Sequence, residues 1–181
     1  GPMARHVADV RAGLLTIAGR HDRDPRSLPV VLEDRAAGRA LRVAVCAAPP
    51  AGSTHSGVAA AIQGAADAFA DAGAEVTEAV PASFQRAVEL WGLLLNEELR
   101  VQRPLLDLVM GDAGKRFLGF ADEVYPPMDL ASVVMGFAER NVVDREWHTF
   151  LTEYDVLLLP TWAQPPFELG ADLVSVEAAM G

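Results

Sequence analysis

Four stretches of the chain carry apolar residues at steps of three and four, a spacing that aligns them along one face of a helix. These stretches are 4–18, 58–69, 84–99 and 130–151. Ser83 and Asp129 stand before the last two, where a short polar side chain can accept a hydrogen bond from the first turn. Pro104 follows the third stretch and predicts a kink or a break. The pattern therefore predicts helices in all four stretches, the last two of them long.

Three shorter stretches have the pattern of strands. They are 41–46, 75–80 and 156–159. The first two flank the helix expected over 58–69, and strand–helix–strand is the arrangement that joins parallel strands through a right-handed crossover. The third run is apolar at every position and ends at Pro160, as expected for a strand covered on both faces. The predicted fold class is therefore α/β, with long helices covering the sheet.

Composition and charge exclude several functional classes. The 181 residues are 51% hydrophobic and 22% charged, which is typical of a globular domain. The formal net charge of −10 would repel phosphate backbones, so we expect no nucleic-acid partner. No apolar run is long enough to span a bilayer, and no membrane association is expected. Cys46, the one cysteine, lies in an apolar run, which predicts a buried thiol and a reducing, cytoplasmic location.

The residues that could carry chemistry do not form a recognised motif. Lys115 follows a glycine, but the spacing fails the phosphate-loop pattern, so we expect a solvated loop lysine. The stretch 52–57 places serines beside His55 without the glycines of a nucleophile elbow, and a helix-capping hydroxyl is expected instead. The four histidines lack metal-ligand spacing, so neither a metal nor a cofactor is predicted. The adjacent carboxylates 97–98 and 122–123 are interpreted as solvated helix faces.

Three segments, in order and spacing, resemble the amidase-signature family. They are GPMARHVAD over 1–9, AGAEV over 72–76 and YDVLLLPT over 154–161. The first is similar to a segment at the start of a helix in the middle of these enzymes, and Asp24 and Pro25 fit the pair that follows that helix. The second is similar to a segment that precedes a strand, and the third to a strand followed by a proline-rich loop. Together they cover nearly the whole chain.

The resemblance implies a fold and a reaction. Residues 1–181 would be a single segment, the C-terminal portion of an amidase domain, forming part of a mixed β-sheet flanked by helices. The family hydrolyses carboxylic amides to an acid and ammonia or an amine through a serine acyl-enzyme, with a second serine and a lysine base. The family's Gly-Ser-Ser-Gly-Gly-Ser segment is absent from this chain, and Lys115 does not match the family's lysine. No catalytic residue is therefore assigned, and we expect the chain alone to be inactive.

The proline-rich stretch after the third strand is the predicted wall of the substrate pocket. We expect 156–159 to be a central strand, and open α/β sheets bind ligands beyond the carboxyl ends of such strands. Trp162 and Phe167 offer flat apolar surface to a substrate. Thr161 and Gln164 can hydrogen-bond an amide, and pockets combine these two kinds of group. The alternative is a rigid surface connector whose aromatic side chains only cover the edge of the sheet. A small-molecule amide is the expected partner.

Two other interpretations remain open at this point. One is a free-standing, non-enzymatic amidase-like protein that serves as a binding or interaction partner. The other is an unrelated doubly wound ligand-binding domain, which needs more strand–helix–strand units than the one that is clear here. The oligomeric state is also open, with a homodimer as one option.

Overall fold

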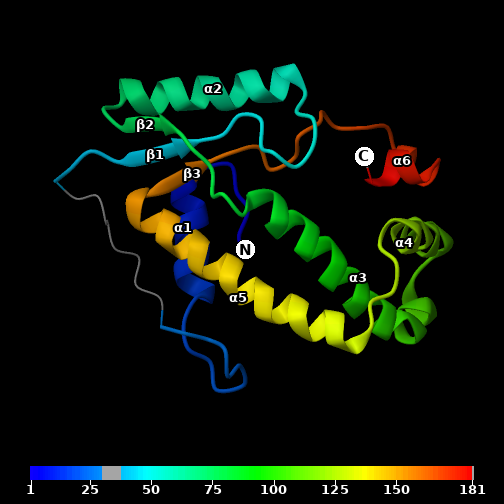
Figure 1. Cartoon of the computed structure of the whole chain (residues 1–181). Coiled ribbons are helices and arrows are strands. Elements are labelled where there is room, and N and C mark those ends of the chain that lie inside the picture. Colours follow the sequence, from blue (N-terminus) through cyan, green and yellow to red (C-terminus); the bar gives the residue numbers. More distant parts are fainter. Residues whose placement is uncertain (30–37, 181) are drawn as a thin grey trace. The chain divides into compact units, whose positions relative to one another are not determined.

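The structure is a computed structural model that describes residues 1–29 and 38–180. The chain divides into two compact units, Gly1–Ala37 and Gly38–Gly181. Helices and a parallel sheet make up the second unit, so the α/β fold class is confirmed (Figure 1).

The first unit contains helix α1, which spans Val7–Ile17 and confirms the helix predicted from the apolar spacing. No residue of α1 is buried, and Val7 and Ile17 are 85% and 68% exposed. After the helix, the Ser27 hydroxyl accepts from the backbone N–H of His21 at 2.8 Å and donates to the carbonyl of Asp24 at 2.6 Å. A helix and a polar turn are therefore the content of this unit among the described residues.

The sheet of the second unit has three parallel strands in the order β2-β1-β3. They are β1 (Arg42–Val45), β2 (Glu75–Glu78) and β3 (Val156–Leu158). Helix α2 (Ser56–Asp71) joins β1 to β2 and lies along one face of the sheet, contacting both strands (Figure 1). The predicted strand–helix–strand unit is therefore confirmed.

The central strand of this sheet is β1, and the expectation that 156–159 would be central is wrong for the described residues. Val43 and Ala44 of β1 are 0% exposed, whereas all three residues of β3 are only half-buried. Among the residues that the structure describes, β3 pairs with β1 alone, so its other edge has no neighbouring strand. An apolar run shows that a strand prefers burial, but not how many neighbours it has.

The amino ends of β1 and β3 are joined by an ion-pair clamp, formed by Arg39, Arg42 and Asp155. Both terminal nitrogens of Arg39 donate to the two Asp155 carboxylate oxygens at 2.6 Å. The Arg42 backbone N–H donates to the same carboxylate at 3.0 Å, and its guanidinium does so at 3.2 Å. These bonds, those from Arg39 foremost, hold the pKa of Asp155 well below its usual range. The clamp thus fixes the register in which the two strands start.

Two long helices, α3 (Phe84–Val109) and α5 (Leu130–Glu153), pack against each other in opposite directions. Phe84, at the start of α3, stacks on Trp147 of α5 with ring centroids 6.0 Å apart. Leu94, further along α3, lies against Gly136, where an added Cβ would come within 3.0 Å of it. Of the kink or break predicted at Pro104, the break is wrong, because α3 continues through this residue to Val109, and the kink stays a prediction.

The ends of these helices test the predicted caps. The Asp129 carboxylate accepts from the Ser132 backbone N–H at 2.7 Å, so this cap is confirmed, and the bond lowers the pKa of Asp129. Ser83 makes no capping bond, and its buried hydroxyl has no hydrogen-bond partner in the described part of the chain. The residue type at the N-cap position was favourable in both cases, but at Ser83 the backbone has φ −83° and ψ 9° rather than an extended conformation.

The segment around Lys115, which was expected to be a loop, forms helix α4 (Asp112–Val124). Lys115 therefore lies in the first turns of a helix and is half-buried, which corrects its interpretation as a solvated loop residue. The short elements η1 (Ala171–Leu173) and α6 (Val176–Met180) contact α4.

Glu97 differs from its prediction as a solvated carboxylate, whereas Asp122 is exposed as predicted and also forms ion pairs. Asp122 of α4 accepts from Arg100 at 3.1 Å and from Arg103 at 2.5 Å, which ties α4 to α3. Glu97 pairs with Arg100 and accepts from the Met128 backbone N–H at 2.9 Å, and its side chain is 16% exposed. Glu97 thus anchors the α4–α5 connection through its hydrogen bond from Met128.

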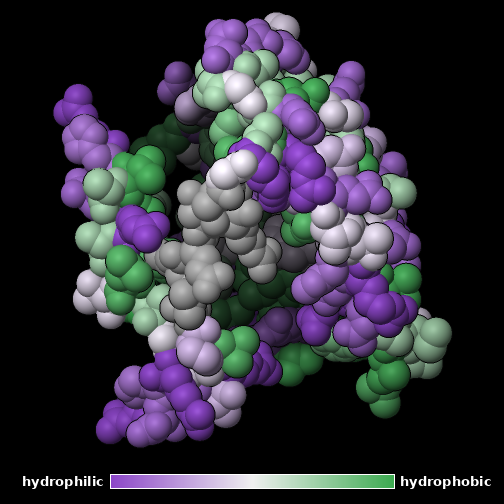
Figure 2. Space-filling view, turned by 90° about the vertical axis from the view of Figure 1, so that its left-hand side faces the viewer, coloured by the Kyte–Doolittle hydropathy of each residue, from purple (hydrophilic) through white to green (hydrophobic). Residues whose placement is uncertain are grey.

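A large apolar surface remains outside the small core. Trp91, Val101, Leu108 and Leu130 are between 65% and 81% exposed. Polar and apolar side chains both reach the surface on the face that Figure 2 draws. None of the described helices is sufficiently long and apolar to traverse a bilayer.

Candidate functional site

The carboxyl ends of β1 and β3 lie at the same edge of the sheet because the two strands are parallel. The loop after β1 is 46–55 and the loop after β3 is 159–170. The Cys46 backbone N–H donates to Leu158 at 2.9 Å, and Pro160 is buried. Cys46 itself is buried, as predicted, and burial raises the pKa of its thiol. The two loops therefore leave the sheet side by side.

Two hydrogen bonds hold these loops together. The His55 backbone N–H donates to the carbonyl of Ala163 at 2.9 Å. The Gln164 side-chain amide donates to the carbonyl of Ser53 at 2.8 Å. The His55 ring in turn accepts a hydrogen bond from the Gly57 backbone N–H at 3.1 Å and caps α2. A hydroxyl was predicted to cap this helix, but the imidazole of His55 does so.

The structure places the four predicted substrate-wall residues at this edge, and the side chain of one of them, Gln164, forms a hydrogen bond to the neighbouring loop. Gln164 is half-buried and bonded to the β1–α2 loop. Trp162 and Phe167 are each 59% exposed, and Thr161 is exposed as well. Two flat apolar side chains and a hydroxyl therefore stand at the carboxyl edge with much of their surface open.

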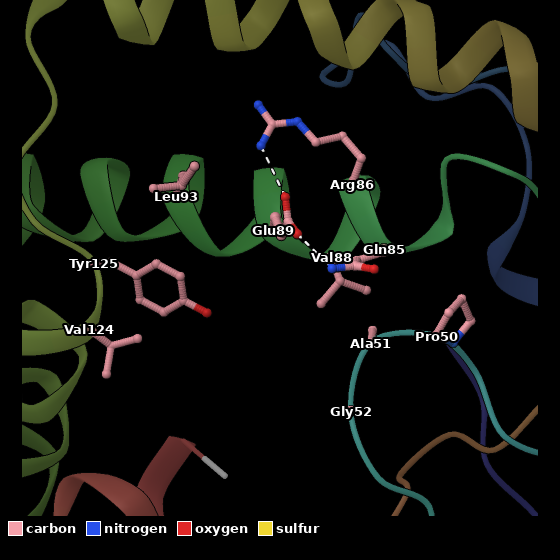
Figure 3. Close-up of a pocket in the computed structure, with 10 residues that line it drawn as sticks. All are labelled: Pro50, Ala51, Gly52, Gln85, Arg86, Val88, Glu89, Leu93, Val124 and Tyr125. Atoms are coloured by element: carbon pink, nitrogen blue, oxygen red, sulfur yellow. Dashed lines mark hydrogen bonds and ion pairs between the residues drawn. The ribbon is translucent and has the colours of Figure 1, made fainter.

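A pocket of about 640 Å³ lies on the other side of the β1–α2 loop (Figure 3). It is formed by that loop, the first turns of α3 and the α4–α5 connection. Its lining residues are Pro50, Ala51, Gly52, Gln85, Arg86, Val88, Glu89, Leu93, Val124 and Tyr125. Its volume is within the range of small-molecule sites, and its lining combines apolar and polar side chains as such sites do.

Arg86 is drawn away from this pocket by carboxylates. Its guanidinium donates to both oxygens of Glu139 on α5 at 2.6 Å and to Glu89 at 3.2 Å (Figure 3 shows the Glu89 pair). These bonds raise the pKa of Arg86 and lower that of Glu139. Gln85 donates its amide to the other oxygen of Glu89 at 3.1 Å. Arg86 is therefore fully engaged by two carboxylates, and the lining residues offer no unpaired cation.

Tyr125 also lines the pocket, and its side chain, unlike that of Arg86, is not hydrogen-bonded to a described residue. Its carbonyl accepts from Arg100 at 2.7 Å, but its hydroxyl has no hydrogen bond to any residue that the structure describes. In Figure 3 the hydroxyl points into the open space between α3 and the loop at Ala51 and Gly52. The ring lies so close to α3 that a Cβ at Gly92 would come within 2.6 Å of three of its atoms.

Sequence reasoning missed this pocket, although one signal was present. Gly92 interrupts a long helical pattern, where glycine costs roughly 1 kcal/mol relative to alanine. Such a residue indicates that another group approaches the helix closely, here the Tyr125 ring. Nothing in the local sequence identified the group, since Tyr125 lies 33 positions further along the chain.

The described residues do not contain a nucleophile with its base. No serine hydroxyl among them is hydrogen-bonded to a lysine or histidine side chain, and no cluster of three or more His, Cys, Asp or Glu residues there could hold a metal ion. Ser53 has only a distant contact, 3.5 Å, with the Gln164 amide. The arrangement can bind and orient a small molecule, but it shows no group poised to attack one.

A parallel sheet with a covering helix, paired loops at its carboxyl edge and a pocket beside them defines an α/β unit. The chain belongs to the amidase family, whose sequence profile matches residues 1–180. An unrelated doubly wound domain is therefore not favoured.

Three curated relatives share this similarity. An indoleacetamide hydrolase of Bradyrhizobium diazoefficiens is 30% identical over 179 residues, covering 98% of this chain and 34% of the relative. An indoleacetamide hydrolase of Bradyrhizobium japonicum is also 30% identical, and the match covers 98% of this chain and 38% of the relative. An acylamidase of Rhodococcus erythropolis is 29% identical over 176 residues, and the match covers 93% of this chain and 37% of the relative. The chain thus spans little more than a third of the length of these relatives.

Proposed function

We propose that the intact protein to which this chain belongs hydrolyses carboxylic amides. The observation that carries the proposal is the match to the amidase family across residues 1–180. In the reaction, R–CO–NH₂ and water give R–COOH and ammonia: a serine oxygen displaces the amine, and water then cleaves the acyl ester. A non-enzymatic binding protein is the weaker interpretation, because the relatives are named as hydrolases or an acylamidase.

In this proposal the chain supplies part of the substrate wall and none of the reacting groups. The loops that meet at the carboxyl edge support this role, because Gln164 orders them while Trp162 and Phe167 remain open to a ligand. The nucleophile and base come from residues outside 1–181. A reducing, cytoplasmic location belongs to the same proposal and is supported by the buried thiol of Cys46.

The proposed substrates are small amides with a flat, apolar acyl group. Two of the relatives are named for indoleacetamide, and the third for acylamides. Trp162 and Phe167 present aromatic surface of the kind that stacks on such groups.

The test is ammonia release by the intact protein from acetamide, phenylacetamide and indole-3-acetamide. We expect turnover of the aromatic amides, and loss of turnover after treatment with a serine-directed acylating reagent. Protein treated with the reagent in the presence of excess substrate is the control, since bound substrate should protect the serine. Absence of ammonia release from all three amides would overturn the proposal.

A further inference from the structure

We propose that the pocket lined by Val88 and Tyr125 receives the acyl group of the substrate and selects neutral, flat groups over anionic ones. The inference rests on the proposed amide hydrolysis and adds the part of the molecule that chooses the acyl group. It assigns selectivity for the acyl group to α3 and the α4–α5 connection. The wall predicted from the sequence, in contrast, is the proline-rich loop.

The first argument is position. Pro50, Ala51 and Gly52 form one wall of the pocket, and they belong to the loop that leaves the carboxyl end of β1. The next residue, Ser53, accepts the hydrogen bond from Gln164 of the loop after β3. The pocket is therefore continuous, through three loop residues, with the edge where ligands of open α/β sheets bind.

The second argument is the shape and chemistry of the lining. Val88, Leu93 and Val124 provide apolar surface from two sides, and the volume of about 640 Å³ accommodates a substituted aromatic ring. The Tyr125 hydroxyl points into this space and has no partner among the described residues. A ligand with one polar edge would satisfy it, and a polar group left unpaired when a ligand covers it is costly.

The third argument is charge. Arg86 is the one cation among the lining residues, and its guanidinium is taken up by Glu139 and Glu89. Glu89 is the other charged residue of the lining, so the lining has no net positive charge and no unpaired cation. An acyl group that carries a carboxylate would lose water in this pocket without a free cation to pair with, and an unpaired charge of this kind is a common source of specificity.

The experiment compares variants of the intact protein on acetamide, phenylacetamide and 4-carboxyphenylacetamide. We expect the wild-type protein to favour phenylacetamide over its carboxylated analogue. Val88→Phe fills the pocket and should lower kcat/KM for phenylacetamide at least about tenfold more than for acetamide. Val109→Phe adds the same ring to the far end of α3, where the side chain is 77% exposed, and is the matched control.

A second variant tests the charge without filling the pocket. Glu89→Gln removes one carboxylate from the rim and should narrow the preference for phenylacetamide over 4-carboxyphenylacetamide. Melting temperatures of all variants separate a change of selectivity from a loss of folding, because unfolding lowers turnover of every amide in proportion.

The outcomes distinguish this inference from the proposed function. If the wild-type protein is active but Val88→Phe and Val109→Phe change the phenylacetamide-to-acetamide ratio equally, the pocket assignment is wrong and the amidase function stands. If the wild-type protein releases no ammonia, the proposed function fails. Calorimetric titration with phenylacetamide then decides on the pocket: binding that Val88→Phe weakens at least about tenfold supports it, and equal or absent binding overturns it.

Discussion

The two ends of the parallel sheet are held together by different kinds of interaction. At the amino end, the Asp155 carboxylate is surrounded by donors from Arg39 and Arg42, and the strands are clamped by charge. At the carboxyl end, the loops are joined by a backbone bond and a neutral side-chain bond. The hydroxyl of Tyr125 has no partner among the described residues, and Trp162 is mostly exposed. The end with satisfied charges maintains the fold, and the end with unengaged groups is the one suited to a ligand.

The largest expected effect separates binding from chemistry at the carboxyl end. Residues 1–181 expressed alone should release no ammonia from any of the amides, because the proposed function places the nucleophile, base and oxyanion donors outside this chain, and one oxyanion donor alone contributes about 3–4 kcal/mol. Mass spectrometry after treatment with a serine-directed acylating reagent should find no selectively labelled serine. Circular dichroism checks that the chain is helical. Turnover by a helical chain, abolished by the reagent, would mean that this edge holds its own chemistry.

The next effect concerns the clamp at the amino end. Asp155→Asn in the intact protein removes the charge that both arginines bind, so the melting temperature should fall by several degrees without a change in the ratio of activities on large and small amides. Glu153→Gln, an exposed residue two positions earlier, is the matched control and should have little effect. A change in substrate selectivity in Asp155→Asn would contradict the division between the two ends.

The same clamp predicts a pH dependence. The folded state lowers the pKa of Asp155, so this carboxylate contributes its stabilisation fully above the ordinary aspartate pKa of about 3.9. As the pH falls below that value, the unfolded state binds the proton first and the contribution is lost. The stability difference between wild type and Asp155→Asn, measured by chemical denaturation, should therefore be constant near neutrality and shrink in acid. A difference that grows in acid would show that the sign is wrong.

A smaller effect is expected where Tyr125 lies against α3. Gly92→Ala would place a Cβ 2.6 Å from the ring, and overpacking of this kind costs about 1–3 kcal/mol. Gly64→Ala in α2 is the matched control, since nothing lies within 4 Å of its Cβ and the substitution should stabilise by roughly 0.5–1 kcal/mol. Free energies of unfolding from denaturant titrations provide the measurement. If both variants shift stability in the same direction, the close approach of Tyr125 is not maintained in solution.

The smallest effect tests the proline-rich loop. Trp162→Ala in the intact protein should lower kcat/KM for phenylacetamide roughly threefold to tenfold more than for acetamide, a modest change because the side chain is 59% exposed. Trp91→Ala removes an equally large, 65% exposed side chain from α3 and serves as the control. If Trp162→Ala lowers both activities equally, or only the melting temperature, the loop is a structural connector.

Local pattern predicted the elements well and their surroundings poorly. The strands β1 and β2 and the cap at Asp129 follow from residues close in sequence, and all three were predicted. The capping role of His55 was not, because the pattern favoured a hydroxyl and imidazole is an uncommon acceptor at that position. Glu97 was taken as solvated, since nothing in sequence shows that Met128 returns to it.

The candidate site shows the same limit. The carboxyl edge and its four wall residues were placed by strand direction alone, which is a local inference. The pocket beside it depends on contacts between α3 and Tyr125 and on an ion pair between Arg86 and Glu139, 53 residues apart. Such contacts depend on how the helices pack, and they cannot be predicted from the local pattern of a single sequence.

The long separation between β1 and β3 has a consequence for the order of folding. Arg42 and Asp155 are 113 residues apart, whereas β2 follows β1 after a single helix. At a synthesis rate of 5–20 residues per second, roughly 6–23 s pass between the appearance of Arg42 and that of Asp155. The β1–α2–β2 unit is complete early in that interval, while the β3 side of β1 remains unpaired until β3 is made. Closing this long loop is the late and slow step of sheet assembly, and until it closes the apolar edge of β1 is open to chaperones and to aggregation.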